Sequence, residues 1–222
     1  MEQVIECMPL VAPARRSPVE LRRVTRLSRA ELDEATELLT AAFEASPLLC
    51  GAFPQAETRR KVLQSLFTAV LEDALQFGRI EIARNGHMAG VLVWYPPGLY
   101  PLSIARTLRL MPHYLRMVAA APLGIAKLFW AQLKLDAVRP RMPHCHGYFL
   151  AGRPGEQVGS VLAKRLLAAA DDLGMPSYLE TQECRTVNLY SRLGFKMLRD
   201  GMSSWPGGPL TWTMWREPPG RD

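Results

Sequence analysis

Cysteine is scarce in this sequence: the 222 residues include four, and none of them form a C-x-x-C pair. Such scattered cysteines argue against a disulfide framework or a structural zinc site, so we expect a reducing cytoplasmic setting. One cluster, His144-Cys145-His146, has metal-binding residue types. A fourth ligand is missing nearby, so we expect no metal.

Long apolar runs are also missing. No apolar stretch reaches the roughly 18 residues that a membrane span needs, and the start lacks the basic, apolar and small-residue order of a secretory signal. We therefore expect a cytoplasmic protein without a membrane span. Basic–aromatic RNA-binding patterns, zinc-finger spacing and helix-turn-helix signatures are absent as well, so we expect no nucleic-acid partner.

The residues that are present are typical of a globular domain, with 48% hydrophobic and 22% charged side chains and a formal net charge of +6. The basic excess is uneven. Residues 99–141 hold seven Lys and Arg against one acid, so this segment alone matches the net charge of the whole chain. Three interpretations remain open here: a solvated helix face, a docking surface for an acidic carrier protein, or a surface for anionic lipid.

Hydrophobic periodicity and turn residues predict the order of elements. Residues 1–20 are expected to form a flexible tail, and residues 21–218 one α/β domain. The clearest local signal is a hairpin over 79–95, where Asn85-Gly86 has the sequence of a type I′ turn. The expected strands are 21–27, 79–83, 88–95, 146–152, 177–182, 194–198 and 209–218. One expected helix follows Ser28 and is broken at Pro47, and others cover 55–77, 157–173 and 185–193. Two more make a helical insertion at 99–140, with a kink or break expected at Pro112. This order predicts a mixed central sheet of about six to seven strands flanked by helices.

The junction at 148–166 is the first candidate site. An apolar run meets a short turn with Pro154 and Gly155, and helical spacing begins at Val158. A strand, a glycine-containing turn and a helix start are the parts of a phosphate cradle, since free amides and the positive helix end attract anions. The shortness of this turn leaves open whether it holds a phosphate.

Five stretches in a fixed order carry a family resemblance: WYPPG at 94–98, HGYFL at 146–150, YLET at 178–181, NLYSRLGF at 188–195 and PLTWTMWREP at 209–218. With them the chain resembles the GNAT superfamily of N-acyltransferases, in particular the bacterial branch similar to puromycin N-acetyltransferase. The resemblance covers about residues 21–218. It implies a GNAT fold with a helical insertion, in which two central strands splay near 149–152 and 177–181.

The resemblance also implies acetyl-CoA or another acyl-CoA as donor, with its pyrophosphate on the loop before a helix. In this chain that loop lacks about three residues, the G-R-G of the family pattern, and Glu156 is expected near the anion. Whether the chain binds CoA is therefore an open question, and the alternative is that it uses no cofactor. The residues expected to bind the donor are Leu150, Ala151, Arg153, Gly155, Val158, Gly159, Ser160 and Asn188.

Two residues are the catalytic candidates. Tyr190 stands where the family has a tyrosine that protonates the leaving thiolate. Glu180 ends a strand, and a buried carboxylate there can take a proton from an amine. The residues expected to line the acceptor side are Trp94, Tyr95, His146, Tyr148 and Trp205.

The function expected from these features is transfer of an acyl group from acyl-CoA to a small-molecule amine by direct attack. Two alternatives stay open. The acyl donor can be bound to an acidic carrier protein, which would dock on the basic segment. Alternatively the fold has lost CoA and catalyses another reaction, such as a cyclisation or elimination on a biosynthetic intermediate, or only binds a ligand. A monomer and a homodimer are both compatible with the sequence.

Overall fold

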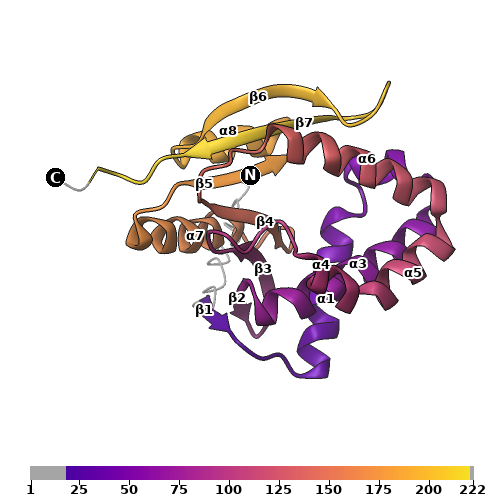
Figure 1. Cartoon of the computed structure of the whole chain (residues 1–222). Coiled ribbons are helices and arrows are strands. Elements are labelled where there is room, and N and C mark those ends of the chain that lie inside the picture. Colours follow the sequence, from indigo (N-terminus) through magenta and orange to yellow (C-terminus); the bar gives the residue numbers. More distant parts are fainter. Residues whose placement is uncertain (1–18, 221–222) are drawn as a thin grey trace, which may run out of the picture.

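The alternating segments of the sequence form one seven-stranded sheet in the computed structural model, which describes residues 19–220 (Figure 1). Most of the expected tail thus lies outside the described residues. The order of strands is β1-β2-β3-β4-β5-β7-β6. All neighbours are antiparallel except β4 and β5, so the predicted mixed sheet is confirmed. The strands are β1 (Glu20–Val24), β2 (Arg79–Asn85), β3 (His87–Tyr95), β4 (Cys145–Gly152), β5 (Ser177–Thr181), β6 (Lys196–Ser203) and β7 (Leu210–Arg216).

Helices cover both faces of this sheet. In Figure 1, α7 lies to the left of the central strands, and α1 and α3 lie to their right. The larger core fills the space between the sheet and α1–α3, and two smaller cores lie under α7 and α8. The helices are α1 (Arg29–Phe43), α2 (Pro47–Ala52), α3 (Ala56–Gln76), α4 (Ile104–Arg109), α5 (Met111–Ala120), α6 (Pro122–Val138), α7 (Gly159–Leu173) and α8 (Cys184–Arg192).

The β2–β3 hairpin forms where its sequence predicts, but its turn is not the expected type I′, because Asn85 lacks the positive φ that both central residues of that turn need. Gly86 takes a φ of 73°, in the left-handed region that favours glycine, and Asn85 pairs with His87 across the turn. Its strands are almost wholly buried because α3 and α7 pack on opposite faces. Gly90 allows α7 to come close: a Cβ at that position would lie 2.6 Å from the Val158 side chain.

The sheet opens at its only parallel pair. β4 and β5 pair over three positions, the last of which is Gly147 with Leu179. Beyond this point β4 continues to Gly152 along β3 while β5 follows β7, so the two strands separate. The expected splay is therefore present, and it begins at Tyr148 and Glu180.

The insertion contains three helices rather than the two expected. Leu110 ends α4 and begins α5, and Pro112 lies in the first turn of α5 instead of kinking a longer helix. Proline is tolerated there because first-turn amides have no intrahelical partner. Pro47 likewise opens the short α2, in a region expected to be a break. No helix within residues 19–220 is long and apolar enough to cross a membrane.

The insertion is fixed to the domain by a buried ion cluster. The Arg106 side chain is 8% exposed; its Nε lies 3.1 Å from Asp73 Oδ1, and its Nη2 contacts Oδ2. Tyr95 donates to Asp73 Oδ2 at 2.8 Å, and Arg109 lies 3.0 Å from Oδ1. Two of the seven cations in the basic segment thus share one carboxylate of α3, which leaves one positive charge in the cluster.

Candidate active site

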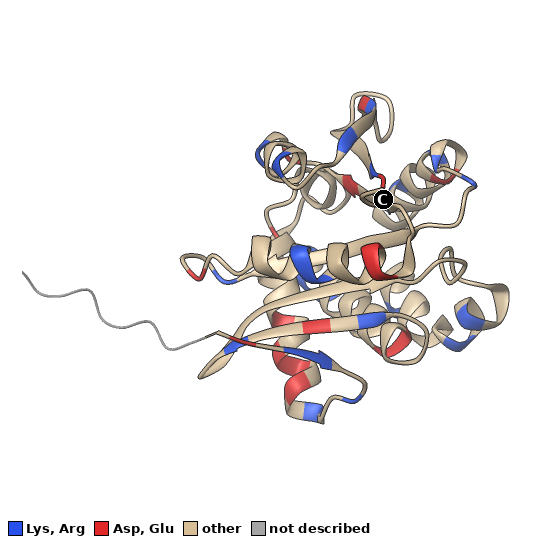
Figure 2. Cartoon of the chain, turned by 90° about the vertical axis from the view of Figure 1, so that its left-hand side faces the viewer, with Lys and Arg blue, Asp and Glu red and all other residues tan. Residues whose placement is uncertain are grey.

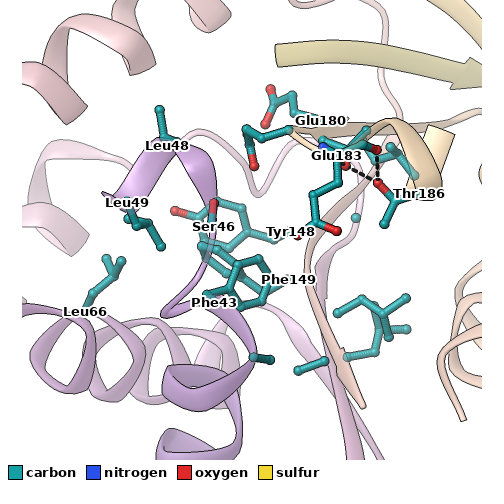
Figure 3. A pocket seen from close by; sticks show the side chains of 18 of the residues that line it. Phe43, Ser46, Leu48, Leu49, Leu66, Tyr148, Phe149, Glu180, Glu183 and Thr186 are labelled. Carbon is teal, nitrogen blue, oxygen red and sulfur yellow. Dashed lines mark hydrogen bonds between the residues drawn. The ribbon is translucent and has the colours of Figure 1, made fainter. Parts of the chain in front are cut away.

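A cleft of about 1010 Å³ passes through the sheet where β4 and β5 separate. On one side it reaches α1, α2 and the insertion, and on the other it reaches α7 and α8. Figure 3 shows Phe43 and Phe149 beside α2 residues Leu48 and Leu49, with Glu180 at the β5 end. Most of its lining side chains are aliphatic or aromatic, so the cleft suits a ligand with substantial apolar surface.

Glu180 is the carboxylate at the point of separation. Its side chain is 12% exposed, and it lines the cleft. Oε1 has no hydrogen-bond partner, and Oε2 lies 3.7 Å from His146 Nε2, which is too long for a hydrogen bond. Burial raises the pKa of Glu180 to about 7, against a partial lowering by the nearby Arg139. A carboxyl group with this pKa and a free oxygen can accept a proton near neutral pH.

The strand register explains why Glu180 has these neighbours. Tyr95, His146 and Tyr178 are register partners in one row across three strands, and Tyr148 and Glu180 each lie two residues further along their strands. Residues two apart share a face, so all five side chains lie on the side of the insertion. Ring contacts connect His146 to Tyr148 at 5.8 Å and to Tyr178 at 5.3 Å.

His146 lies behind the cleft wall rather than in it. It is 1% exposed, and neither ring nitrogen has a hydrogen-bond partner. Burial lowers its pKa well below the usual value, with further lowering by Arg139 and His144. The ring is therefore neutral at pH 7, and its contact with Glu180 is not an ion pair. The Tyr178 hydroxyl is equally buried and unpartnered.

Tyr190 approaches the cleft from α8, on the other face of the sheet. It lines the cleft and packs edge-on against Phe195, with ring centroids 5.6 Å apart. Burial raises the pKa of its hydroxyl to about 12. The group is thus protonated at neutral pH and available to donate a hydrogen bond into the cleft.

The turn between β4 and α7 is held against the hairpin. Arg153 donates from its backbone amide to Ala89 O at 2.8 Å and from Nε to Met88 O at 2.9 Å. Gly155 has φ 84° and Gln157 has φ 54°, so two left-handed residues close this short turn. Strain is expected at Gln157 because it is not glycine.

Glu156 does not face an anion site in this turn. Its carboxylate accepts from Asn85 Nδ2 at 3.3 Å and lies 3.3 Å from His87 Nε2. The following helix has no side-chain cap and no acidic residue in its first turn. The first amides of any helix lack intrahelical partners, and here no capping side chain occupies them, as an anion-binding helix start requires.

Some of the residues predicted for the site do line the cleft. They are Tyr148, Leu150, Ala151, Arg153, Glu180 and Tyr190. Gly155, Gly159 and Ser160 belong to the turn and helix start beside it, while Val158 is buried beneath α7.

Other predicted residues lie elsewhere. Trp94 is 2% exposed in the core under α7, because its position in β3 points to the opposite face from Tyr95. Tyr95 is fully buried behind Tyr148 and is bonded to Asp73. Asn188 is exposed on α8 and is not in contact with the cleft. The placement differs from the prediction because strand alternation and helix phase decide direction.

Trp205 has a supporting position between the last two strands. A Cβ on Gly51 of α2 would lie 3.0 Å from its ring, and Lys127 of α6 lies 5.4 Å from the ring centroid. The ring therefore connects the β6–β7 loop to two helices that border the cleft, without lining the cleft itself.

Arg139 is a residue that the sequence interpretation missed as part of the site. Its guanidinium lies 4.6 Å from the Tyr100 ring centroid and contacts Asp136. It also lowers the pKa of Glu180 and of His146. An arginine near the end of a basic helix gives no sequence signal for this position. The only hint was its place just before the strand with His146.

Comparison with known structures supports the architecture. No family model matches the chain. It is similar over 92% of its length to a Corynebacterium glutamicum protein described as histone acetyltransferase HPA2 and related acetyltransferase, with 98% of that chain covered, 24% identity and a TM-score of 0.66. Arylalkylamine N-acetyltransferase 2 from Aedes aegypti is 14% identical with a TM-score of 0.57, over 90% of this chain and 98% of that one.

A third similar structure is FeeM, an N-acyl amino acid synthase from uncultured soil microbes, at 12% identity and a TM-score of 0.54, over 91% of this chain and 92% of that one. At these identities the similarity shows a common fold. The chain therefore has the GNAT fold that the resemblance predicted. The closer resemblance to the puromycin N-acetyltransferase branch stays a prediction.

Proposed function

We propose that the protein transfers an acyl group from an acyl thioester, with acyl-CoA as donor, to a small amine. The observation that carries this proposal is the cleft through the splayed β4–β5 pair, with Glu180 as a buried carboxylate at the point of separation. GNAT-fold neighbours described as N-acetyltransferases and as an N-acyl amino acid synthase support it.

The open edge of β4 explains how a thioester arm would bind. Beyond Gly147, this edge has no strand partner, so its backbone groups are available to the amides of an extended ligand. The pyrophosphate of the donor would then reach Arg153 and the uncapped start of α7. Glu156 does not oppose this, since its carboxylate is held by Asn85 and His87.

The chemical steps follow from the two cleft residues. The neutral amine attacks the thioester carbonyl, and Glu180 takes the amine proton directly or through a water molecule. Collapse of the tetrahedral intermediate breaks the carbon–sulfur bond. Tyr190 then stabilises the leaving thiolate by donating a hydrogen bond; with a pKa of about 12 it is a weak donor of the whole proton to a thiol of lower pKa.

The acceptor side suits an amine with a bulky apolar group. Phe43, Leu49 and Leu66 line the cleft there. Phe43 and Phe149 pack with the buried Phe67 in an aromatic cluster whose ring centroids lie 5.1–5.6 Å apart. Burial of apolar ligand surface against these side chains is favourable, and few polar groups on the ligand need a hydrogen-bond partner there.

A two-stage experiment tests this function. Calorimetric titration with acetyl-CoA is expected to show micromolar binding, and thiol release is then followed with a panel of apolar and polar amines. The rate is expected to rise with pH to a limb near pH 7, because Glu180 must be deprotonated. Glu180→Gln is expected to lower kcat by at least ~100-fold without loss of acetyl-CoA binding.

Glu57→Gln is the matched control, because the Glu57 side chain is 83% exposed on α3 and is not among the residues that line the cleft. An equal loss of kcat in both variants would rule out Glu180 as the base. An unchanged kcat in Glu180→Gln would rule it out as well. Absence of acetyl-CoA binding at millimolar concentration would favour the second candidate, a CoA-independent reaction. The short, fixed β4–α7 turn and the proton-accepting Glu180 are the observations that support that candidate.

A further inference from the structure

The outer side of α5 and α6 exposes large apolar side chains. Six of them form what we term the apolar face: Leu115, Val118, Leu123, Phe129, Trp130 and Leu133. Six such residues within nineteen consecutive positions form a denser group than the exposed apolar residues elsewhere in the described chain, where Ile104 with Leu108 and Met197 with Leu198 occur as pairs. Contiguous apolar surface of this kind marks an interaction site more often than solvent-exposed structure.

The geometry of α6 shows that these side chains share a direction. Leu123, Phe129, Trp130 and Leu133 are 81%, 65%, 53% and 46% exposed. At 3.6 residues per turn they fall within an arc of roughly 120° on the helix. Ala126 and Ala137 are exposed within the same arc, so no charged residue interrupts it.

Cations without acidic partners border the apolar face. Lys127 donates to Gly51 O and Lys134 to Ser203 O, which are backbone carbonyls. Arg116 of α5 is exposed and has no ion pair with any of the residues described, but it lies in a hollow beside α3 rather than at the margin of the apolar face. The single acid of α6, Asp136, is paired with Arg139. The charge at this face is therefore positive and uncompensated.

The β1–α1 edge provides the contrast. Figure 2 shows basic residues of β1 beside acidic residues of α1. Arg22 and Arg84 both lie against Glu31, at 2.9 and 3.3 Å, and Arg23 is paired with Glu81. Positive charge on that edge is neutralised by neighbours, whereas the charge beside α5 and α6 is left for a partner.

The apolar face is continuous with the cleft. Phe129 belongs to both, because it is largely exposed and also lines the cleft. Ile125, Leu128 and Met117, from the inner sides of α6 and α5, continue the apolar lining inwards. An apolar ligand lying against the face thus has a path of apolar contacts into the cleft.

We propose that the apolar face docks on an anionic membrane surface. A helix with Trp, Phe and Leu on one side and Lys and Arg at the margin is the pattern of an interfacial helix. Anionic lipid attracts the cations while the acyl region takes the apolar side chains. A second copy is disfavoured as occupant since two positive faces repel, and an acidic protein would leave the apolar centre of the face without a matching surface.

Sedimentation with lipid vesicles tests this proposal on the full chain. We expect binding to phosphatidylcholine vesicles that contain about one third phosphatidylglycerol, weakened by salt and by omission of the anionic lipid. Leu123→Glu and Trp130→Glu are each expected to lower the partition coefficient at least ~tenfold, because a carboxylate would enter the interface.

Leu173→Glu is the matched control. Leu173 is a 52% exposed leucine at the end of α7, away from the insertion, so this variant is expected to retain binding within ~twofold. No binding by the unmodified protein would overturn the proposal, as would equal losses in the control. A dimer that Leu123→Glu dissociates, measured by light scattering, would also overturn it in favour of a second copy.

Discussion

Two buried polar clusters lie on the same side of the sheet and are built in opposite ways. In the cluster of Asp73, Arg106 and Tyr95, both carboxylate oxygens are occupied by donors. In the cluster of Glu180, His146 and Tyr178, one carboxylate oxygen, both ring nitrogens and the hydroxyl have no partner. Polar groups are expensive to bury without hydrogen bonds, so the second cluster is a cost to stability that a function would justify.

The two clusters show how a structural polar cluster can be told apart from a chemical one in this protein. Residue types are similar, since each cluster has a carboxylate and a tyrosine. Asp73 lies among cations that hold the insertion in place, whereas Glu180 lies at the wall of a cleft with its pKa raised to about 7. A perturbed pKa in a cleft is the feature expected of a proton-transfer residue.

The largest effect on stability is expected in the cluster of Asp73, Arg106 and Tyr95, in which both carboxylate oxygens have hydrogen-bond donors. Asp73→Asn removes the charge that Arg106 needs and leaves a guanidinium buried without an anion. Breaking one side of a buried ion pair lowers the free energy of unfolding by about 3–5 kcal/mol. Urea unfolding followed by circular dichroism measures this change; a loss below about 1 kcal/mol would show that the cluster is not structural.

Glu180→Gln is expected to change stability in the opposite direction. The folded pKa of about 7 lies above the ordinary 4.5, so the protonated carboxyl contributes stability that is present below pH 4.5 and lost as the pH rises through 7. At pH 8 the variant avoids this loss and should be more stable by up to about 3 kcal/mol.

Unfolding curves for Glu180→Gln and the unmodified protein at pH 4.5 and pH 8 check this prediction. The difference between them should grow as the pH rises from 4.5 to 8. A difference that is independent of pH would mean that the Glu180 pKa is not raised by folding, and the comparison of the two clusters would lose its physical basis.

The smallest effect is expected at Tyr190, which lies across the cleft from both clusters. Tyr190→Phe keeps the ring contact with Phe195 and removes only the hydroxyl. We expect stability within about 1 kcal/mol of the unmodified protein and a fall in kcat of about tenfold, the loss of one hydrogen bond to the thiolate. Thiol release at saturating donor measures it. Unchanged kcat would remove Tyr190 from the mechanism.

Local signals in the sequence were sufficient for most elements. The Asn85-Gly86 turn, the periodic stripe of α3 and the alternation in β7 each depend on neighbouring residues, and each element appears where it was expected. The breaks expected at Pro47 and Pro112 are present, since one helix ends before each proline. The new helix that each proline opens was not predicted, although proline is favoured in a first turn.

The site was only partly predictable, because local sequence signals do not fix the direction in which side chains point. Glu180 and Tyr148 could be proposed because they lie on strands whose ends were recognisable. Trp94 was proposed for the cleft but lies on the other face of β3 from Tyr95, and Arg139 was missed because nothing local distinguishes it from other basic residues. Side-chain direction at the splay also depends on a register shift between Val93 and Trp94, which the sequence does not reveal.

The elements, their order and the class of sheet could be predicted from the sequence, since helix and strand periodicity are local properties of the chain. Which polar groups have hydrogen-bond partners depends instead on tertiary contacts. Asp73 and Arg106 are 33 residues apart and meet through packing of the insertion on α3. Glu180 Oε1 has no hydrogen-bond partner among the described residues, at the point where β4 and β5 separate. Hydrogen-bond partners and burial are set by contacts between distant segments, and these set the pKa and hence the chemistry of the cleft.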